Sequence, residues 1–289
     1  MYRRGLRKTN LRVISSLSLS VRQGEILAVV GSSGSGKSLL AHAILGILPP
    51  NASTAGSIRY NGEELTPALQ RKYRGTEIAL IPQSVDYLDP LMRVGAQVMG
   101  TRGSREQQRA AFDRYGLERR AARLFPFQLS GGMARRVLVS TAVLSPPKLI
   151  VADEPTPGLG IEMAMETLRH FREIADTGAG VLLITHDIDL ALGIADRIAV
   201  FYAGTTVEIA PAADFKTGAE ALRHPYSRAF IDALPQNAFR PIPGTQPYAG
   251  ALPSGCLFAD RCPLRSDACG GEIELRAVRG GEVRCVHAS

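Results

Sequence analysis

The stretch Gly31-Ser32-Ser33-Gly34-Ser35-Gly36-Lys37-Ser38 decides the fold of this chain. It has the spacing G-x-x-x-x-G-K-S, follows a short apolar run at residues 25–30, and precedes residues 39–48 with apolar side chains at helical spacing. Strand, glycine loop and helix in this order are the context that a phosphate-binding loop requires. Glycines let backbone N–H groups point inward, and the helix adds the positive end of its dipole. We therefore expect a nucleoside triphosphate to be bound by Gly31, Ser32, Ser33, Gly34, Ser35, Gly36, Lys37, Ser38 and Leu39.

The chain has 289 residues, with 34 lysines and arginines against 27 acidic residues, so its net charge is +7. This length allows one large α/β domain with an appendage, or two modest domains. The basic balance favours an anionic partner without choosing among nucleotide, nucleic acid and lipid. No run approaches 18 uncharged apolar residues and the first residues contain no apolar signal core, so we expect a chain that neither spans a membrane nor is exported.

Polar side chains follow three further apolar runs that are typical of buried parallel strands. Gln83 follows residues 77–82, the pair Asp153-Glu154 follows residues 148–152, and His186 follows residues 180–185. Ligands bind at the carboxyl edge of such sheets. We expect Lys37 to contact the β- and γ-phosphates, Ser38 and Asp153 to hold Mg²⁺, and Glu154 to polarise the attacking water as general base.

The remaining pattern predicts an α/β fold with an antiparallel β subdomain and a helical insertion over about residues 84–145. The alternation at residues 17–21 predicts an antiparallel strand, and residues 197–202 and 204–209 predict a hairpin. Ser130 is expected to cap a helix whose first turn holds Gly131 and Gly132, where an anion can approach the backbone. Tyr2 is interpreted either as a stacking partner for adenine or as a disordered terminal residue, and a complete domain of this kind would have a strand before it.

Four cysteines lie near the end of the chain with the spacing C-x5-C-x6-C-x15-C, namely Cys256, Cys262, Cys269 and Cys285. Without an export signal, a metal site is a better interpretation than disulfides. Zinc sites favour two close pairs, which this spacing lacks, whereas open spacing with proline directly after Cys262 suits a [4Fe–4S] cluster. Zn²⁺ and unligated thiols remain the alternatives.

Together, these motifs resemble the ATP-binding subunit of ABC transporters over roughly residues 1–215. The resemblance implies a P-loop NTPase core in which two such subunits close head to tail on two ATP molecules. Each ATP would lie between the phosphate loop of one subunit and Ser130, Gly131 and Gly132 of the other. It also implies that Gln83 senses Mg²⁺ and the membrane partner, and that His186 contacts the γ-phosphate. Arg135 and Arg136 are expected to be surface charges of the helix.

This sequence departs from the family pattern at two positions. Met133 stands where the family usually has glutamine, and Gly160 stands where it has an aspartate that helps communication across the dimer. The change at Gly160 favours a heterodimer with unequal sites. Residues 224–230, 242–244 and the cysteine segment resemble the C-terminal extension of peptide and nickel importer ATPases, which is thought to carry an iron–sulfur cluster. We therefore expect a nucleotide-binding domain at 1–222 and an extension at 223–289.

The leading interpretation is an ATPase that powers import of peptides or nickel complexes. The resemblance implies two transmembrane permease subunits, indirect contact with an extracytoplasmic substrate-binding protein, and a peripheral position on the cytoplasmic face of the inner membrane. One alternative is a soluble ABC-type ATPase acting on nucleic acid or ribosomes, although no stretch combines basic residues with interleaved aromatics. Another is a metal-responsive regulatory module with a vestigial ATPase. The transported substrate is not encoded in this chain.

Overall fold

The computed structural model describes residues 11–32 and 34–289, together with the backbone of residues 2–4 and 7–9. In this part of the chain, an eight-stranded sheet has the order β11-β12-β10-β9-β3-β8-β7-β6. Its parallel strands are β9 (Arg197–Tyr202), β3 (Ile26–Gly31), β8 (Gly180–Ile184), β7 (Leu149–Asp153) and β6 (Ile78–Ile81). The antiparallel strands are β10 (Thr205–Pro211), β12 (Gly281–Val283) and β11 (Arg276–Val278).

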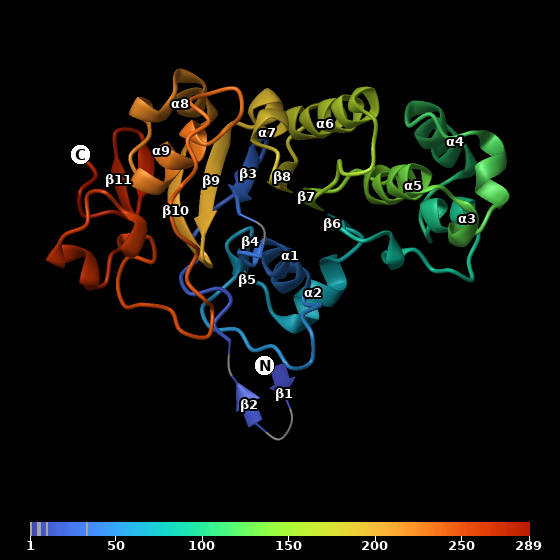
Figure 1. The fold of residues 1–289 in the computed structure, drawn as a ribbon. Helices are drawn as coiled ribbons and strands as arrows, with labels where there is room; N and C mark the ends of the chain where they lie inside the picture. Colours follow the sequence, from blue (N-terminus) through green and yellow to red (C-terminus); the bar gives the residue numbers. More distant parts are fainter. Residues whose placement is uncertain (1, 5–6, 10, 33) are drawn as a thin grey trace.

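Helices cover both faces of the parallel part of the sheet (Figure 1). The side chains of β3 divide between two apolar clusters: Ile26, Ala28 and Val30 join one, and Leu27 and Val29 join the other. The runs that predicted the parallel strands are almost continuously apolar because both faces of these strands are buried. The first cluster includes residues of α6 (Ile161–Asp176), α7 (Ile188–Ile194), α8 (Ala212–Thr217) and α9 (Pro225–Asp232), and the second includes residues of α1 (Lys37–Leu45) and α2 (Pro67–Tyr73).

A helical insertion connects β6 to β7, as expected, and it has an apolar cluster of its own. Figure 1 shows it at the right of the molecule, beyond the edge of the sheet. Phe112, Val137 and Val94 are fully buried in this cluster. The insertion consists of α3 (Val94–Met99), α4 (Arg105–Arg114), α5 (Gly131–Val143) and the 3₁₀ turns Val85–Tyr87, Arg119–Arg123 and Pro126–Gln128.

The prediction of a strand over residues 17–21 is wrong. In this region only Ser16 forms a bridge, with Thr205, while Leu17, Leu19 and Val21 pack against the α1 side of the core. The alternation arises because every second side chain in this segment is packed against the core. The backbone of residues 17–21 has no partner strand, so no strand forms. Two short hairpins lie outside the main sheet, β1 (Tyr2–Arg4) with β2 (Arg7–Thr9), and β4 (Arg59–Tyr60) with β5 (Glu63–Glu64).

The C-terminal residues extend the main sheet. Strand β12 pairs with β10, and β11 pairs with β12, so the end of the chain lies along the sheet edge at the left of Figure 1. The segment also contains the 3₁₀ turns Ala219–Ala221, Ala259–Arg261 and Asp267–Gly270. The hairpin of β9 and β10 confirms the predicted pair of strands.

A buried ion pair fixes this segment to the sheet. Glu208 of β10 accepts hydrogen bonds from the backbone N–H groups of Arg223 and His224, each at 2.8 Å. The Arg223 guanidinium lies 3.3 Å from the Glu208 carboxylate and 2.8 Å from Asp214, and it donates to the Val278 carbonyl at 2.8 Å. Arg223 therefore connects β10, α8 and the end of β11.

Replacement of Arg223 by methionine is expected to lower the free energy of unfolding by about 3–5 kcal/mol, because Glu208 would remain buried without its cation. Urea titration followed by circular dichroism would measure this loss. Arg265→Met is the matched control, since Arg265 pairs with Asp260 on the surface, where side-chain exposures are 61% and 71%, and such pairs contribute about 1 kcal/mol or less. Equal effects of the two substitutions would contradict the assigned role of Arg223.

Candidate functional site

The phosphate loop begins where β3 ends. A Cβ atom on Gly31 would lie 2.1 Å from the Phe201 carbonyl oxygen of β9, so only glycine fits there. Gly34 and Gly36 have φ values of 77° and 92°, which glycine adopts readily. Gly36 is also the N-cap of α1, so the loop passes directly into the helix. This is the strand–loop–helix geometry that the sequence predicts.

Lys37 is buried inside this loop. Its ammonium donates to the carbonyl oxygens of Gly31 at 2.8 Å and Ser32 at 2.9 Å. Burial lowers the pKa of Lys37, whereas the nearby carboxylates of Glu154 and Asp153 act in the opposite direction. Because an ammonium has three N–H donors, one remains for a phosphate oxygen.

The other predicted loop residues are arranged around this centre. The Ser35 hydroxyl is buried and has no hydrogen-bond partner among the described residues. Leu39 lies half-buried in the first turn of α1, with its N–H bonded to the Gly36 carbonyl at 3.0 Å. Ser33 and the Tyr2 side chain lie outside the described residues, although the Tyr2 backbone belongs to β1.

Asp153 lies at the end of β7 with its carboxylate buried. Burial raises its pKa, and a hydrogen bond with Ser38 opposes that rise. Its Oδ1 atom has no hydrogen-bond partner among the described residues. A buried carboxylate with a free oxygen beside a hydroxyl fits the oxygen ligands that Mg²⁺ requires.

Glu154 and His186 lie together at the same edge of the sheet. Nδ1 of His186 lies 2.9 Å from both carboxylate oxygens of Glu154 and forms a hydrogen bond with Oε1. Oε2 is buried without a hydrogen-bond partner in the described part of the chain. Glu154 has a φ of 48°, and its N–H donates to the Ile184 carbonyl at 2.9 Å, which fixes the carboxylate at the strand end. The side chain of His186 is 65% exposed, so solvent reaches this pair.

Gln83 follows β6, as expected, and its side chain is exposed. The expectation that Arg135 is a surface charge is wrong, because its side chain is buried and donates to the carbonyl oxygens of Pro82 at 2.7 Å and of Gln83. Burial lowers the pKa of Arg135, and the charges of Asp153 and Glu154 oppose this effect. The sequence contains no signal for these contacts, because they join α5 to a loop about 50 residues earlier.

Arg136 also points back into the protein. It donates to the backbone carbonyls of Tyr115 at 3.1 Å, Gly116 at 2.8 Å and Gly132 at 3.3 Å. Both arginines therefore stabilise the helical insertion around the start of α5. Arg136 is half-buried, so the expectation of a helix-surface charge is wrong for Arg135 alone.

The predicted anion-binding turn opens α5. Ser130 is the N-cap and accepts a hydrogen bond from the Met133 N–H at 3.3 Å. A Cβ atom on Gly131 would meet nothing within 4 Å, so the helix start is open. Gly132 has less space around it than Gly131, since a Cβ atom there would lie 3.0 Å from the Gly158 carbonyl oxygen. This turn belongs to the helical insertion, whereas the phosphate loop belongs to the sheet.

Gly160 is the N-cap of α6 and provides no side-chain hydrogen bond. The position has room for a side chain, because a Cβ there would meet nothing within 4 Å. Its glycine is therefore not required by packing.

All four cysteines are free thiols, with Cys269 and Cys285 buried and Cys256 and Cys262 half-buried. Burial raises the pKa of Cys256 to about 11, and the three neighbouring thiols contribute to the rise. Cys269 Sγ lies 3.6 Å from Nε2 of His287. No group of three or more His, Cys, Asp or Glu side chains among the described residues is arranged to hold a metal ion. The donor set suits a metal, but the arrangement does not form a closed site.

Comparisons with known proteins agree with this geometry. Residues 14–157 match the family described as ABC transporter, and residues 207–269 match the family described as Oligopeptide/dipeptide transporter, C-terminal region. The dipeptide transport ATP-binding protein DppD of Escherichia coli (strain K12) is 36% identical over 283 residues, which cover 90% of this chain and 86% of that protein. The oligopeptide transport ATP-binding protein OppD of Salmonella typhimurium is 32% identical over 296 residues, covering 95% and 88%.

Solved structures share the fold. The ATP-binding subunit of an ABC transporter has a TM-score of 0.62 at 27% identity, covering 71% of this chain and 86% of that one. A dimeric ATP-binding cassette in a post-hydrolysis state, bound to ADP and Pi, has a TM-score of 0.63 at 25% identity, covering 73% and 94%. The chain therefore belongs to the ATP-binding proteins of ABC transporters, in the group that carries the oligopeptide/dipeptide transporter C-terminal region.

Proposed function

We propose that this chain binds and hydrolyses ATP to power a membrane importer of peptides. The observation that carries the proposal is the Glu154–His186 pair, 2.9 Å apart, at the sheet edge where Lys37 is buried in the phosphate loop. The names of the relatives support peptides as the cargo, since they are dipeptide and oligopeptide transport ATP-binding proteins. Nickel complexes remain the second cargo class.

In this proposal Glu154 is the general base. Nδ1 of His186 lies 2.9 Å from both carboxylate oxygens and forms its hydrogen bond with Oε1, so Oε2 is the oxygen left to accept a proton from the attacking water. His186 holds the other carboxylate oxygen through Nδ1, which leaves Nε2 for the γ-phosphate. Lys37 contributes its remaining N–H to the β- and γ-phosphates. Ser38, Gln83 and Asp153 would hold Mg²⁺, which neutralises charge on the phosphates when it is bound.

A second ATP-binding subunit completes the site. The open N-terminus of α5 gives Ser130, Gly131 and Gly132 the N–H groups that an anion requires. We propose that they close over the ATP held by a homologous partner, and that Gly160 makes this partner a different chain. Residues 1–222 would act as the nucleotide-binding domain and 223–289 as its extension.

The membrane partners would be two transmembrane permease subunits, which receive peptide from an extracytoplasmic substrate-binding protein. In the part of the chain that the structure describes, no helix has the length and apolar character needed to cross a membrane. We place the subunit peripherally at the cytoplasmic face of the inner membrane. The alternative of an ATPase on nucleic acid or ribosomes is not favoured, because the C-terminal region belongs to a transporter family.

Affinity purification of the full chain from its native membrane is expected to recover two multi-spanning proteins and a second ATP-binding subunit. Mass spectrometry of the eluate identifies them. As a control for non-specific recovery of membrane proteins, the chain is released from the membrane with salt and purified without detergent. The two multi-spanning proteins should then be absent from the eluate. Recovery of nucleic acid or ribosomal proteins in their place would support the alternative function and contradict the proposal.

Glu154→Gln is expected to reduce ATP hydrolysis by about 100-fold or more, because a general base contributes roughly 10²–10⁴-fold. ATP binding should persist, since the phosphate loop is unchanged. Phosphate release and binding of a fluorescent ATP analogue would be measured on the assembled complex. Glu118→Gln is the control, because Glu118 forms an exposed ion pair with Arg120. Undiminished hydrolysis by Glu154→Gln would contradict the role of Glu154 as general base, whereas loss of hydrolysis without loss of biological function would support the regulatory module with a vestigial ATPase.

We further propose that Cys256, Cys262, Cys269 and Cys285 hold a [4Fe–4S] cluster, with Zn²⁺ as the alternative. The support is chemical: four free thiols lie in one short segment, and three of them contribute to the raised pKa of Cys256. Metal binding requires their deprotonation and their movement into a common site. Such a site would stabilise a segment with few apolar residues of its own.

Protein purified without oxygen is expected to be brown and to contain iron and labile sulfide in equal amounts. Elemental analysis, sulfide assay and visible absorption would measure this, with Cys269→Ser as a variant expected to lose the colour. Stoichiometric zinc without iron would contradict the cluster and favour the alternative. Absence of both metals would overturn the proposal of a metal site.

A further inference from the structure

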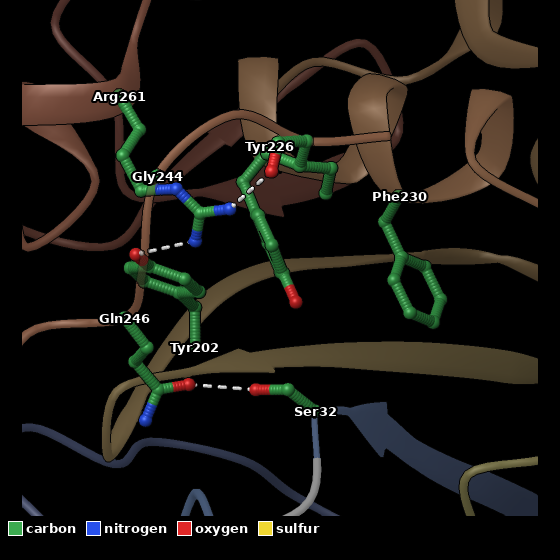
Figure 2. A pocket seen from close by; sticks show the side chains of 8 residues that line it. Ser32, Tyr202, Tyr226, Phe230, Gly244, Gln246 and Arg261 are labelled. Atoms are coloured by element: carbon green, nitrogen blue, oxygen red, sulfur yellow. Dashed lines mark hydrogen bonds between the residues drawn. The ribbon is translucent and has the colours of Figure 1, made fainter. Parts of the chain in front are cut away.

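A segment of the C-terminal region contacts the phosphate loop directly. Oγ of Ser32 donates a hydrogen bond to Oε1 of Gln246 at 2.6 Å, although the two residues are 214 positions apart in the sequence. Figure 2 shows this bond beside a cavity of about 380 Å³, whose lining comes from both parts of the chain. We name residues 242–246 the strap.

The strap is anchored by Arg261. The guanidinium donates to the carbonyl oxygens of Pro243 at 2.6 Å and Ile242 at 2.9 Å. It also donates to the Tyr202 hydroxyl at 3.1 Å, so it connects the strap to the end of β9 (Figure 2). Because guanidinium is planar and its donors point in fixed directions, these three bonds hold the strap in one position relative to the sheet.

Ser32 is held from more than one side. Its carbonyl accepts a hydrogen bond from Lys37 Nζ at 2.9 Å, while its hydroxyl is bonded to the strap. Tyr226 of α9 lines the same cavity as Ser32, so this helix also lies beside the loop. The position of the Ser32 backbone therefore determines one of the two acceptors that orient the lysine.

We propose that the strap positions the phosphate loop for ATP, with Gln246 acting through Ser32 on Lys37. This inference rests on the proposed ATPase function and adds a role for the C-terminal region in it. Gln246 is a positioning residue, because its bond is to the loop. The phosphate loop is rich in glycine and serine and would be flexible without such contacts. A loop that is fixed before binding loses less conformational freedom when the ligand arrives.

The expected signature is a loss of ATP affinity with little change in the chemical step. One neutral hydrogen bond corresponds to about a five-fold change in an equilibrium constant. Ser32→Ala and Gln246→Leu should each raise the dissociation constant for ATP by about five-fold, and Gln246→Leu should raise the KM to the same extent with kcat within about two-fold of the parent chain. Glu154 and His186 make no contact with the strap among the described hydrogen bonds, so the chemical step should be preserved.

The test is a double-mutant cycle on the full chain in its assembled complex. If the two side chains act through their mutual bond, the double variant should bind ATP no worse than either single variant. Ser32→Thr keeps the hydroxyl and should restore most of the affinity. Gln236→Leu is the control, because the Gln236 amide bonds Asp189 on α7 and not the phosphate loop. Thermal unfolding of every variant would exclude loss of folding as the cause.

The outcomes separate this inference from the proposed function. Parent protein that neither binds nor hydrolyses ATP would contradict the ATPase function itself. If the parent binds ATP and both single variants bind it with the same affinity, the proposed positioning role of the strap is contradicted. Strictly additive losses in the double variant would also overturn it, because each side chain would then act independently.

Discussion

The contact between Gly31 and β9 is the constraint on which the site depends. With the Phe201 carbonyl only 2.1 Å from where a Cβ would lie, the first residue of the phosphate loop must be glycine. This contact brings the end of β3 into register with the end of β9 and starts the loop at the carboxyl edge of the sheet. Every other site group on the sheet is placed relative to that edge, because parallel strands deliver their C-terminal residues to the same side.

Opposite charges share the interior of this edge. Lys37 and Arg135 are cations, Asp153 and Glu154 are anions, and all four side chains are buried. Burial disfavours each charge by itself, while the carboxylates favour the charged forms of both cations. Two cations and two anions lie together, so each charge offsets part of the cost of burying the others. A polyphosphate entering this region therefore encounters donors that are already fixed by protein carbonyls.

The sequence predicted the parts of the structure that local patterns encode. Apolar runs such as residues 25–30 became parallel strands, and the polar residues after them, Glu154 and His186, meet at one edge. The alternation at residues 17–21 led to a wrong prediction of a strand, because it results from the burial of every second side chain and not from strand pairing. Arg135 could not be placed, since a charged residue in a helix gives no sign that carbonyls about 50 residues away will accept its hydrogen bonds.

The C-terminal segment was the least predictable part. Strands β11 and β12 have three residues each, too short for a recognisable pattern, and they form only because β10 offers an edge. The buried Glu208–Arg223 pair was likewise invisible, because glutamate and arginine are usually surface residues. The family resemblance indicated that an extension exists, while its attachment to the sheet and to Ser32 depended on contacts between residues far apart in the chain.

The hydrogen bonds of Arg135 couple the helical insertion to the sheet. The helical insertion has an apolar cluster of its own, and α5 also contributes Val139 and Ala142 to the core against the sheet, so this helix lies at the boundary between the two parts. The guanidinium of Arg135 crosses that boundary and is bonded to the backbone at Pro82 and Gln83. Since separating a buried guanidinium from its acceptors is costly, any shift of α5 would carry the backbone at Pro82 and Gln83 with it, so the helix and the end of β6 would move together.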